Sequence, residues 1–193
     1  MLISNIREYY KRYLSPVKGD NVRNSHGIDH CDDVYNLMIL LNDKLKYGYS
    51  KSVIALAAYT HDLYSDTKNR SNHHKLAYEH VINRNDDILK TINSETLSLI
   101  ANAVLEHRAS YTGEFSSNLS RLISAADRGL PDYDLHYNRS LVYNDGNHKE
   151  VVDHLVDKFG RDGYATKKYP DFYIEMFKEE LEIFFKKIDN VNL

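Results

Sequence analysis

Residues 53–66 read VIALAAYTHDLYSD, and this stretch decides the fold. Its first six residues, 53–58, are all apolar, which is typical of a helix that is buried among other helices. The run leads to His61 and Asp62, with Asp66 one turn later. An aspartate buried beside a histidine needs compensation, and a cation is the usual compensating partner. We therefore interpret His61-Asp62 as the centre of a metal site.

The periodicity of the remaining chain is helical. Apolar residues spaced three and four apart predict helices at about residues 3–13, 30–47, 50–63, 73–84, 94–107, 119–126, 151–159 and 172–188. Pro16 is expected to end the first helix, and residues 129–147 are expected to be irregular. No alternating strand pattern exceeds four residues. With 193 residues, the chain is expected to form one all-α domain with a sizeable core.

Composition excludes several classes of protein. Charged residues make up 27% of the chain and hydrophobic residues 42%, as in ordinary soluble domains. With a net charge of -3, the chain gives no reason to expect a surface that binds long nucleic acid. The single cysteine, Cys31, excludes an internal disulfide and indicates a reducing compartment. No stretch reaches the roughly 18 apolar residues of a membrane span. We expect a cytoplasmic protein without a membrane partner.

Further metal ligands must come from other segments, because helix-bound cations take histidine nitrogens and carboxylate oxygens from several elements. His30 begins one apolar stripe, and Asp127 follows another. Taken singly, His30 also reads as a helix N-terminal residue and Asp127 as a helix-end carboxylate. The pair His61-Asp62 reads either as two ligands or as a buried hydrogen-bonded pair. Spacing alone leaves these alternatives open.

The order and spacing of His30, His61-Asp62 and Asp127 resemble the H…HD…D pattern of the HD superfamily of metal-dependent phosphohydrolases. Residues 25–34, SHGIDHCDDV, resemble a subgroup whose first motif has two histidines separated by three residues and then a valine. Residues 125–128, AADR, resemble the family's closing motif. The resemblance implies one HD-type domain over residues 1–193. Its motif core would span about residues 25–130, with C-terminal helices at 148–189 packing on that core.

The resemblance also implies a ligand set. The four motif residues would hold one divalent cation and leave positions open for water and a phosphate oxygen. Some HD proteins hold a second cation through two further histidines, and His74 and His107 occupy those places, with His73 as a competing neighbour. These histidines also read as surface caps or phosphate contacts. The mixture of imidazole and carboxylate suits Mn, Fe, Co, Ni or Zn, and Mg less well.

Catalysis would use water whose pKa the metal lowers toward neutrality, with Asp62 and Asp66 as the candidate catalytic residues. Asp66 points the same way as Asp62 if the helix continues, and it reads equally as a loop carboxylate. Residues 61–67, HDLYSDT, resemble the HDxxEDT segment of guanosine-tetraphosphate hydrolases, although Ser65 replaces the glutamate. Candidates for substrate or phosphate binding, each of which also reads as a surface residue, are Lys68, Arg70, Arg108, Arg128 and His26.

The expected function is hydrolysis of a small phosphate ester or anhydride, a nucleotide above all, by metal-activated water. One alternative is a phosphodiesterase or nuclease that acts on cyclic or short oligonucleotides. Another is a non-catalytic, nucleotide-sensing HD module. The expected partner is a small phosphorylated substrate, neither long nucleic acid nor a membrane is expected, and a homodimer is left open.

Overall fold

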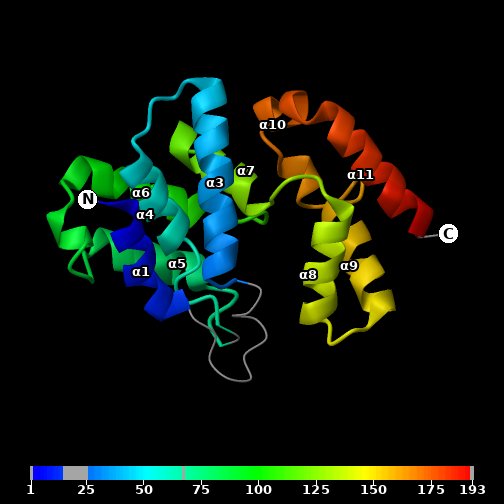
Figure 1. Ribbon diagram of the computed structural model, residues 1–193, viewed down its shortest axis with the longest axis horizontal. Helices are drawn as coiled ribbons and strands as arrows, with labels where there is room; N and C mark the ends of the chain where they lie inside the picture. The colour runs from blue at the N-terminus through cyan, green and yellow to red at the C-terminus, as the bar shows by residue number, and fades with distance from the viewer. Residues whose placement is uncertain (1, 15–25, 67, 192–193) are drawn as a thin grey trace. The chain divides into compact units, whose positions relative to one another are not determined.

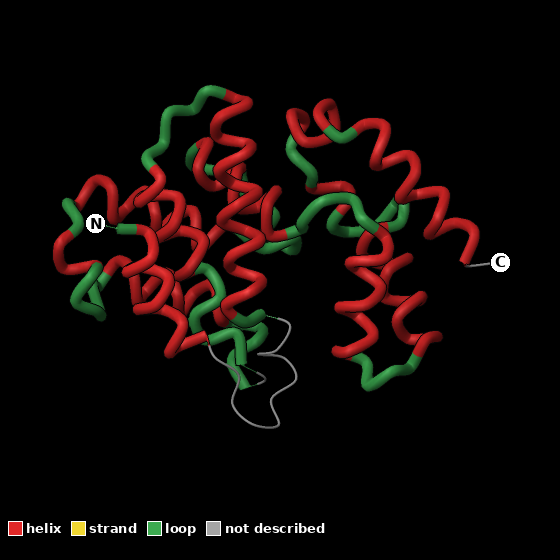
Figure 2. The backbone as a smooth tube through the Cα atoms, viewed as in Figure 1, coloured by secondary structure: helices red, strands yellow, loops and turns green. Residues whose placement is uncertain are grey.

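The computed structural model describes residues 2–14, 26–66 and 68–191 of the chain. Over these ranges the secondary structure is helical and contains no strand (Figure 2). The prediction of an all-α fold is therefore confirmed. The chain divides into two compact units, Met1–Asp127 and Arg128–Leu193, and each is described by itself. The single domain and the packing of C-terminal helices on the motif core remain predictions.

The first unit surrounds one buried helix. Its elements are α1 (Ile3–Leu14), α3 (Ile28–Leu45), α4 (Lys51–Thr60), α5 (His73–Ile82), the short 3-10 helix η1 (Leu89–Thr91), α6 (Ser94–Glu106) and α7 (Asn118–Asp127) (Figure 1). Helix α4 packs against α1, α3, α6 and α7, and all of its residues from Ile54 to Thr60 are buried. Ser50 caps it by accepting a hydrogen bond from the Val53 amide at 3.3 Å. The apolar run therefore forms the central helix, as predicted.

Helix α4 ends earlier than its apolar pattern predicts. Its last helical residue is Thr60, and residues 61–64 form turns. Tyr64 has a φ of 70°, a left-handed conformation in which a right-handed helix cannot continue. Asp66 therefore does not follow Asp62 along one helical face, so the geometric condition for its predicted role is not met.

The sequence also predicts Ser94 as the N-cap of the helix at about residues 94–107, and the observed cap lies one residue earlier. The N-cap of α6 is Asn93, whose side chain accepts from the Thr96 amide at 2.9 Å, and Ser94 is already helical. Both residue types cap helices well, so adjacent candidates cannot be separated by type. Pro16, predicted to end α1, lies outside the described residues.

The second unit contains α8 (Tyr133–Tyr143), α9 (His148–Phe159), the 3-10 helix η2 (Thr166–Lys168), α10 (Asp171–Met176) and α11 (Lys178–Val191). Helix α8 occupies a segment that was expected to be irregular, and Asp132 caps it by accepting from the Leu135 amide at 3.1 Å. The predicted last helix is two helices, because the backbone leaves helical geometry at Phe177, with φ -115° and ψ 28°. None of the helices in the described ranges is both long enough and apolar enough to cross a membrane.

Candidate metal centre

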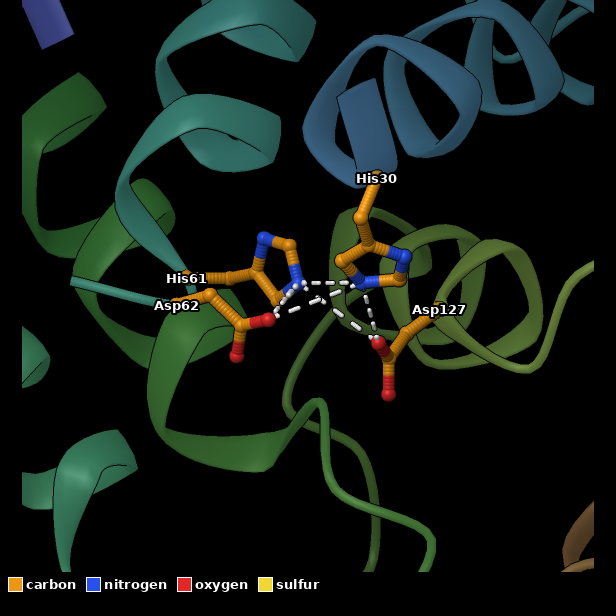
Figure 3. A group of neighbouring side chains, drawn as sticks. All are labelled: His30, His61, Asp62 and Asp127. Carbon is orange, nitrogen blue, oxygen red and sulfur yellow. Dashed lines mark hydrogen bonds and ion pairs between the residues drawn. The ribbon is translucent and has the colours of Figure 1, made fainter. Parts of the chain in front are cut away.

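Four side chains from three helices converge at one end of α4 (Figure 3). His30 lies in the first turn of α3, His61 is the C-cap of α4, Asp62 follows it, and Asp127 is the last residue of α7. One ligand atom from each lies within 4.8 Å of the others. The two histidine Nε2 atoms are 3.3 Å apart, and Nε2 of His30 is 3.1 Å from Oδ1 of Asp127. The structure thus brings all four motif residues together.

The tautomer of His61 is fixed by the helix that carries it. Its Nδ1 lies 2.8 Å from the carbonyl oxygen of Ala58, which can only accept, so Nδ1 donates. In the neutral ring, Nε2 then presents its lone pair toward Oδ2 of Asp62 at 3.4 Å and Oδ1 of Asp127 at 3.5 Å. A metal-ligating histidine is typically oriented in this way by a backbone carbonyl on its other nitrogen.

A second group shares Asp62 with the first. Its other oxygen, Oδ1, lies 3.3 Å from Nε2 of His73 and 3.9 Å from Nε2 of His107. Nδ1 of His73 donates to the Arg70 carbonyl at 2.7 Å, and Nδ1 of His107 donates to the Val104 carbonyl at 2.6 Å. Both rings therefore direct Nε2 toward the carboxylate. Asp62 has one oxygen facing each group.

The histidine in this second group is His73 and not His74. His73 is 6% exposed and opens α5. His74, one residue later, points elsewhere because successive side chains of a helix are about 100° apart. Its Nδ1 is buried without a hydrogen-bond partner, and burial and the nearby Arg108 lower the pKa of His74 to about 4. The sequence analysis gives His73 only as a competing neighbour of His74. The residue at which α5 begins decides which of the two side chains faces Asp62, and that start is the signal that could have separated them.

The electrostatics of the site favour bound cations. Burial disfavours the charged forms of Asp62 and Asp127, but the surrounding histidines hold the pKa of both carboxyls well below the usual range. Burial and the neighbouring His61 lower the pKa of His107 to about 3, and burial lowers the pKa of His30. Burial also opposes a charge on His61, yet Asp62 and Asp127 raise its pKa well above the usual value. The site thus holds ionised carboxylates, two neutral imidazoles and one imidazole that attracts a proton.

One predicted substrate residue contacts the site directly. Nδ1 of His26 lies 2.7 Å from Oδ2 of Asp62, and its Nε2 lies 3.3 Å from Nη1 of Arg70. Since the carboxylate accepts, Nδ1 of His26 donates and its Nε2 faces the guanidinium. His26 therefore contacts the carboxylate that the two groups share, and Arg70 contacts His26.

The remaining predicted residues are not members of either ligand group. Asp66 accepts hydrogen bonds from the backbone and side-chain nitrogens of Asn69 at 2.9 and 3.2 Å, which closes a turn. Lys68 is exposed. Arg108 donates to the Ser71 carbonyl at 2.8 Å. Arg128 belongs to the second unit, where it is 2% exposed and its Cζ lies 5.7 Å from the centre of the Tyr169 ring.

The donor atoms fit divalent transition metals. Two nitrogen ligands that share one ion at about 2.1 Å stand roughly 3.0–3.4 Å apart in octahedral or tetrahedral sites. The Nε2 pairs His30–His61 and His73–His107, at 3.3 and 3.2 Å, have this spacing. Imidazole mixed with carboxylate is the ligand chemistry of Mn, Fe, Co, Ni and Zn. The residues present therefore fit a resident cation.

Comparison with protein families agrees with this reading of the site. The HD domain family model matches residues 27–130, which is more than half of the chain. The chain therefore belongs to the HD domain family, whose members are generally metal-dependent hydrolases within a phosphohydrolase superfamily. Searches of curated proteins and of solved structures gave no significant match. All residues of the two groups lie inside the matched range.

Proposed function

We propose that this protein hydrolyses a small phosphate ester or anhydride, with a nucleotide as the substrate class, at a metal centre formed by His30, His61, Asp62 and Asp127. The observation that supports this proposal most is the convergence of these four ligand atoms within 4.8 Å at the end of a buried helix. A bound divalent cation would supply Lewis acidity and water of near-neutral pKa. Membership of the HD domain family supports the same class of reaction.

Residues of this chain would orient the metal ligands and supply negative charge to the centre. Asp62 and Asp127 supply two carboxylates of lowered pKa, which stay ionised and neutralise cation charge. The Ala58 carbonyl holds His61 in the tautomer that offers Nε2. On the Asp62 side of the centre, Arg70 would bind phosphate oxygens, because a guanidinium matches phosphate geometry.

We further propose that each of the two groups would hold a cation, with Asp62 as a ligand in both. Its two oxygens face different histidine groups, with Oδ2 toward His30 and His61 and Oδ1 toward His73 and His107. Paired cations are common where an enzyme displaces a group at phosphorus. The same arrangement suits a phosphodiesterase, so cyclic and short oligonucleotides are the second substrate class. A non-catalytic nucleotide sensor is the third alternative.

The test combines metal analysis with a substrate screen. Purified protein loaded with Mn²⁺, Fe²⁺, Co²⁺, Ni²⁺ or Zn²⁺ should release phosphate or pyrophosphate from at least one nucleotide. Asp62→Asn should abolish both metal retention and turnover. Asp29→Asn is the matched control, because Asp29 is an exposed carboxylate one residue before His30. Turnover that survives in Asp62→Asn would contradict the site, and bound nucleotide without turnover would favour the sensor.

A further inference from the structure

The turn that carries two proposed ligands has a strained backbone two residues downstream. Tyr64 has a φ of 70°, in the region that favours glycine and is rare for a bulky residue. Two turns form this segment: the Leu63 amide donates to the Thr60 carbonyl, and the Ser65 amide donates to the Asp62 carbonyl, so Tyr64 lies within the second turn. A conformation of this kind persists only when the surrounding structure holds it in place.

The hydroxyl of Tyr64 provides such a hold. Its oxygen lies 2.8 Å from Nδ1 of His80, on α5, although 37% of the tyrosine is exposed. His80 itself is only 4% exposed. The hydroxyl of the partly exposed tyrosine is therefore hydrogen-bonded to a buried ring. This bond anchors the turn that contains Asp62 and Tyr64.

The buried ring is in turn held by a carboxylate. Nε2 of His80 lies 2.9 Å from Oδ2 of Asp86, which is 4% exposed. The same oxygen accepts from the Tyr10 hydroxyl of α1 at 2.8 Å, while Oδ1 accepts from the Leu89 amide at 2.8 Å. An ionised Asp86 can only accept, so Nε2 of His80 donates to it. In the neutral ring, Nδ1 is then left as the acceptor for the Tyr64 hydroxyl.

We propose that Tyr64 is a positioning residue of the metal centre. It is held by a chain of hydrogen bonds that runs from Tyr10 through Asp86 and His80 to Tyr64. This chain connects α1, the segment before η1 and α5 to the turn that carries His61 and Asp62. None of its four residues belongs to either ligand group. The inference rests on the proposed metal site, and it assigns a ligand-orienting role to residues that the family pattern does not include.

The test is metal affinity in Tyr64→Phe, which keeps the ring and removes the anchoring hydroxyl. Mn²⁺ binding is measured by titration calorimetry at a temperature at which circular dichroism shows the variant to be fully folded. Partners that orient metal ligands change affinity by about 10–100-fold, and Tyr64 acts one step further away, so we expect a loss of about three- to tenfold. Tyr78→Phe is the matched control on α5, because the Tyr78 hydroxyl makes no hydrogen bond to the described residues. Its affinity should be unchanged.

Two further variants separate positioning from simple stability. Tyr64→Gly relieves the backbone conformation but lacks the hydroxyl, so its affinity should fall at least as far as that of Tyr64→Phe. Tyr10→Phe removes the buried hydroxyl at the other end of this chain of hydrogen bonds, and it should weaken Mn²⁺ binding less than Tyr64→Phe does. Adding it to Tyr64→Phe should then have little further effect on affinity, because the anchor is already lost.

The outcomes distinguish this inference from the proposed function. Folded Tyr64→Phe protein that binds Mn²⁺ within twofold of the wild type would overturn the positioning role and leave the proposed metal centre intact. Tyr64→Gly that binds as tightly as the wild type would also overturn it, since backbone conformation alone would then suffice. Wild-type protein that binds no Mn²⁺ or other divalent cation would overturn both.

Discussion

The Nε2 atoms of His73 and His107 lie 3.2 Å apart, although both rings already donate their Nδ1 protons to backbone carbonyls. Two neutral imidazoles in this tautomer direct lone pairs at one another. Such a contact is unfavourable unless a proton or a cation lies between the two nitrogens. Asp62 faces the same pair, so this contact supports the second cation that we propose.

The first prediction concerns metal stoichiometry. Wild-type protein should retain two Mn²⁺ per chain, and His73→Ala should retain one, because the second group loses a ligand. His74→Ala is the adjacent control and should retain two, since His74 belongs to neither group. Metal analysis after gel filtration measures the ratio. Loss of a cation in His74→Ala but not in His73→Ala would exclude the arrangement proposed for α5.

The second prediction concerns pH. In the metal-free protein, burial opposes a charge on His61, but Asp62 and Asp127 raise its pKa well above its usual value, so its Nε2 holds a proton more tightly than a free imidazole does. A cation that binds Nε2 must displace this proton. Metal affinity should therefore rise with pH, by about tenfold per unit below that pKa, with release of about one proton. Calorimetry in buffers of different ionisation enthalpy measures the release, and pH-independent affinity would contradict it.

Sequence patterns predicted the parts of this site that depend on local composition. The run at residues 53–58 has no polar interruption, so its burial in α4 followed from composition alone. The motif order also indicated four residues that the fold places together. The choice between His73 and His74 depended instead on where α5 begins, and a rotation of one residue at a helix start leaves no trace in composition.

Other features depend on tertiary contacts that a pattern does not record. Helix α8 has a weak apolar stripe, and its start is set by the Asp132 cap. The break before α11 falls at Phe177, an apolar residue that extends the helical pattern. The left-handed turn at Tyr64 uses a residue type that rarely marks turns, and its anchor, His80, is 16 residues away. These features depend on contacts between side chains in the folded protein, so the sequence pattern could not predict them.

The third prediction tests Asp66, whose catalytic role rests on sequence alone. Asp66→Asn removes the charge but keeps an oxygen that can accept from the Asn69 amide, so the turn should survive. A general base at this position should contribute about 10²–10⁴-fold to kcat. Steady-state kinetics at saturating metal measures the loss. A change below about threefold would leave Asp66 as a turn-closing carboxylate, which is the role that its present hydrogen bonds support.

The last prediction concerns the acid stability of the second unit. His136 is 7% exposed, donates from Nε2 to the Leu130 carbonyl at 2.9 Å, and packs against Phe159 with ring centres 4.4 Å apart. Burial lowers the pKa of His136 to about 4. Its pKa in the unfolded chain is about 6.5, so between these values the unfolded state binds more protons and the free energy of unfolding falls as pH falls.

From pH 6.5 to 4, the stability lost through His136 should approach about 3 kcal/mol. His136→Phe keeps an aromatic ring beside Phe159 but cannot titrate, so the variant should lose less stability over this range than the wild type. Denaturant unfolding followed by circular dichroism at several pH values from 7 to 4 measures the difference between the two proteins. His148→Phe, at an exposed histidine of the same unit, is the control and should follow the wild type. Parallel pH dependence in wild type and His136→Phe would mean that His136 takes up its proton without unfolding the helices around it.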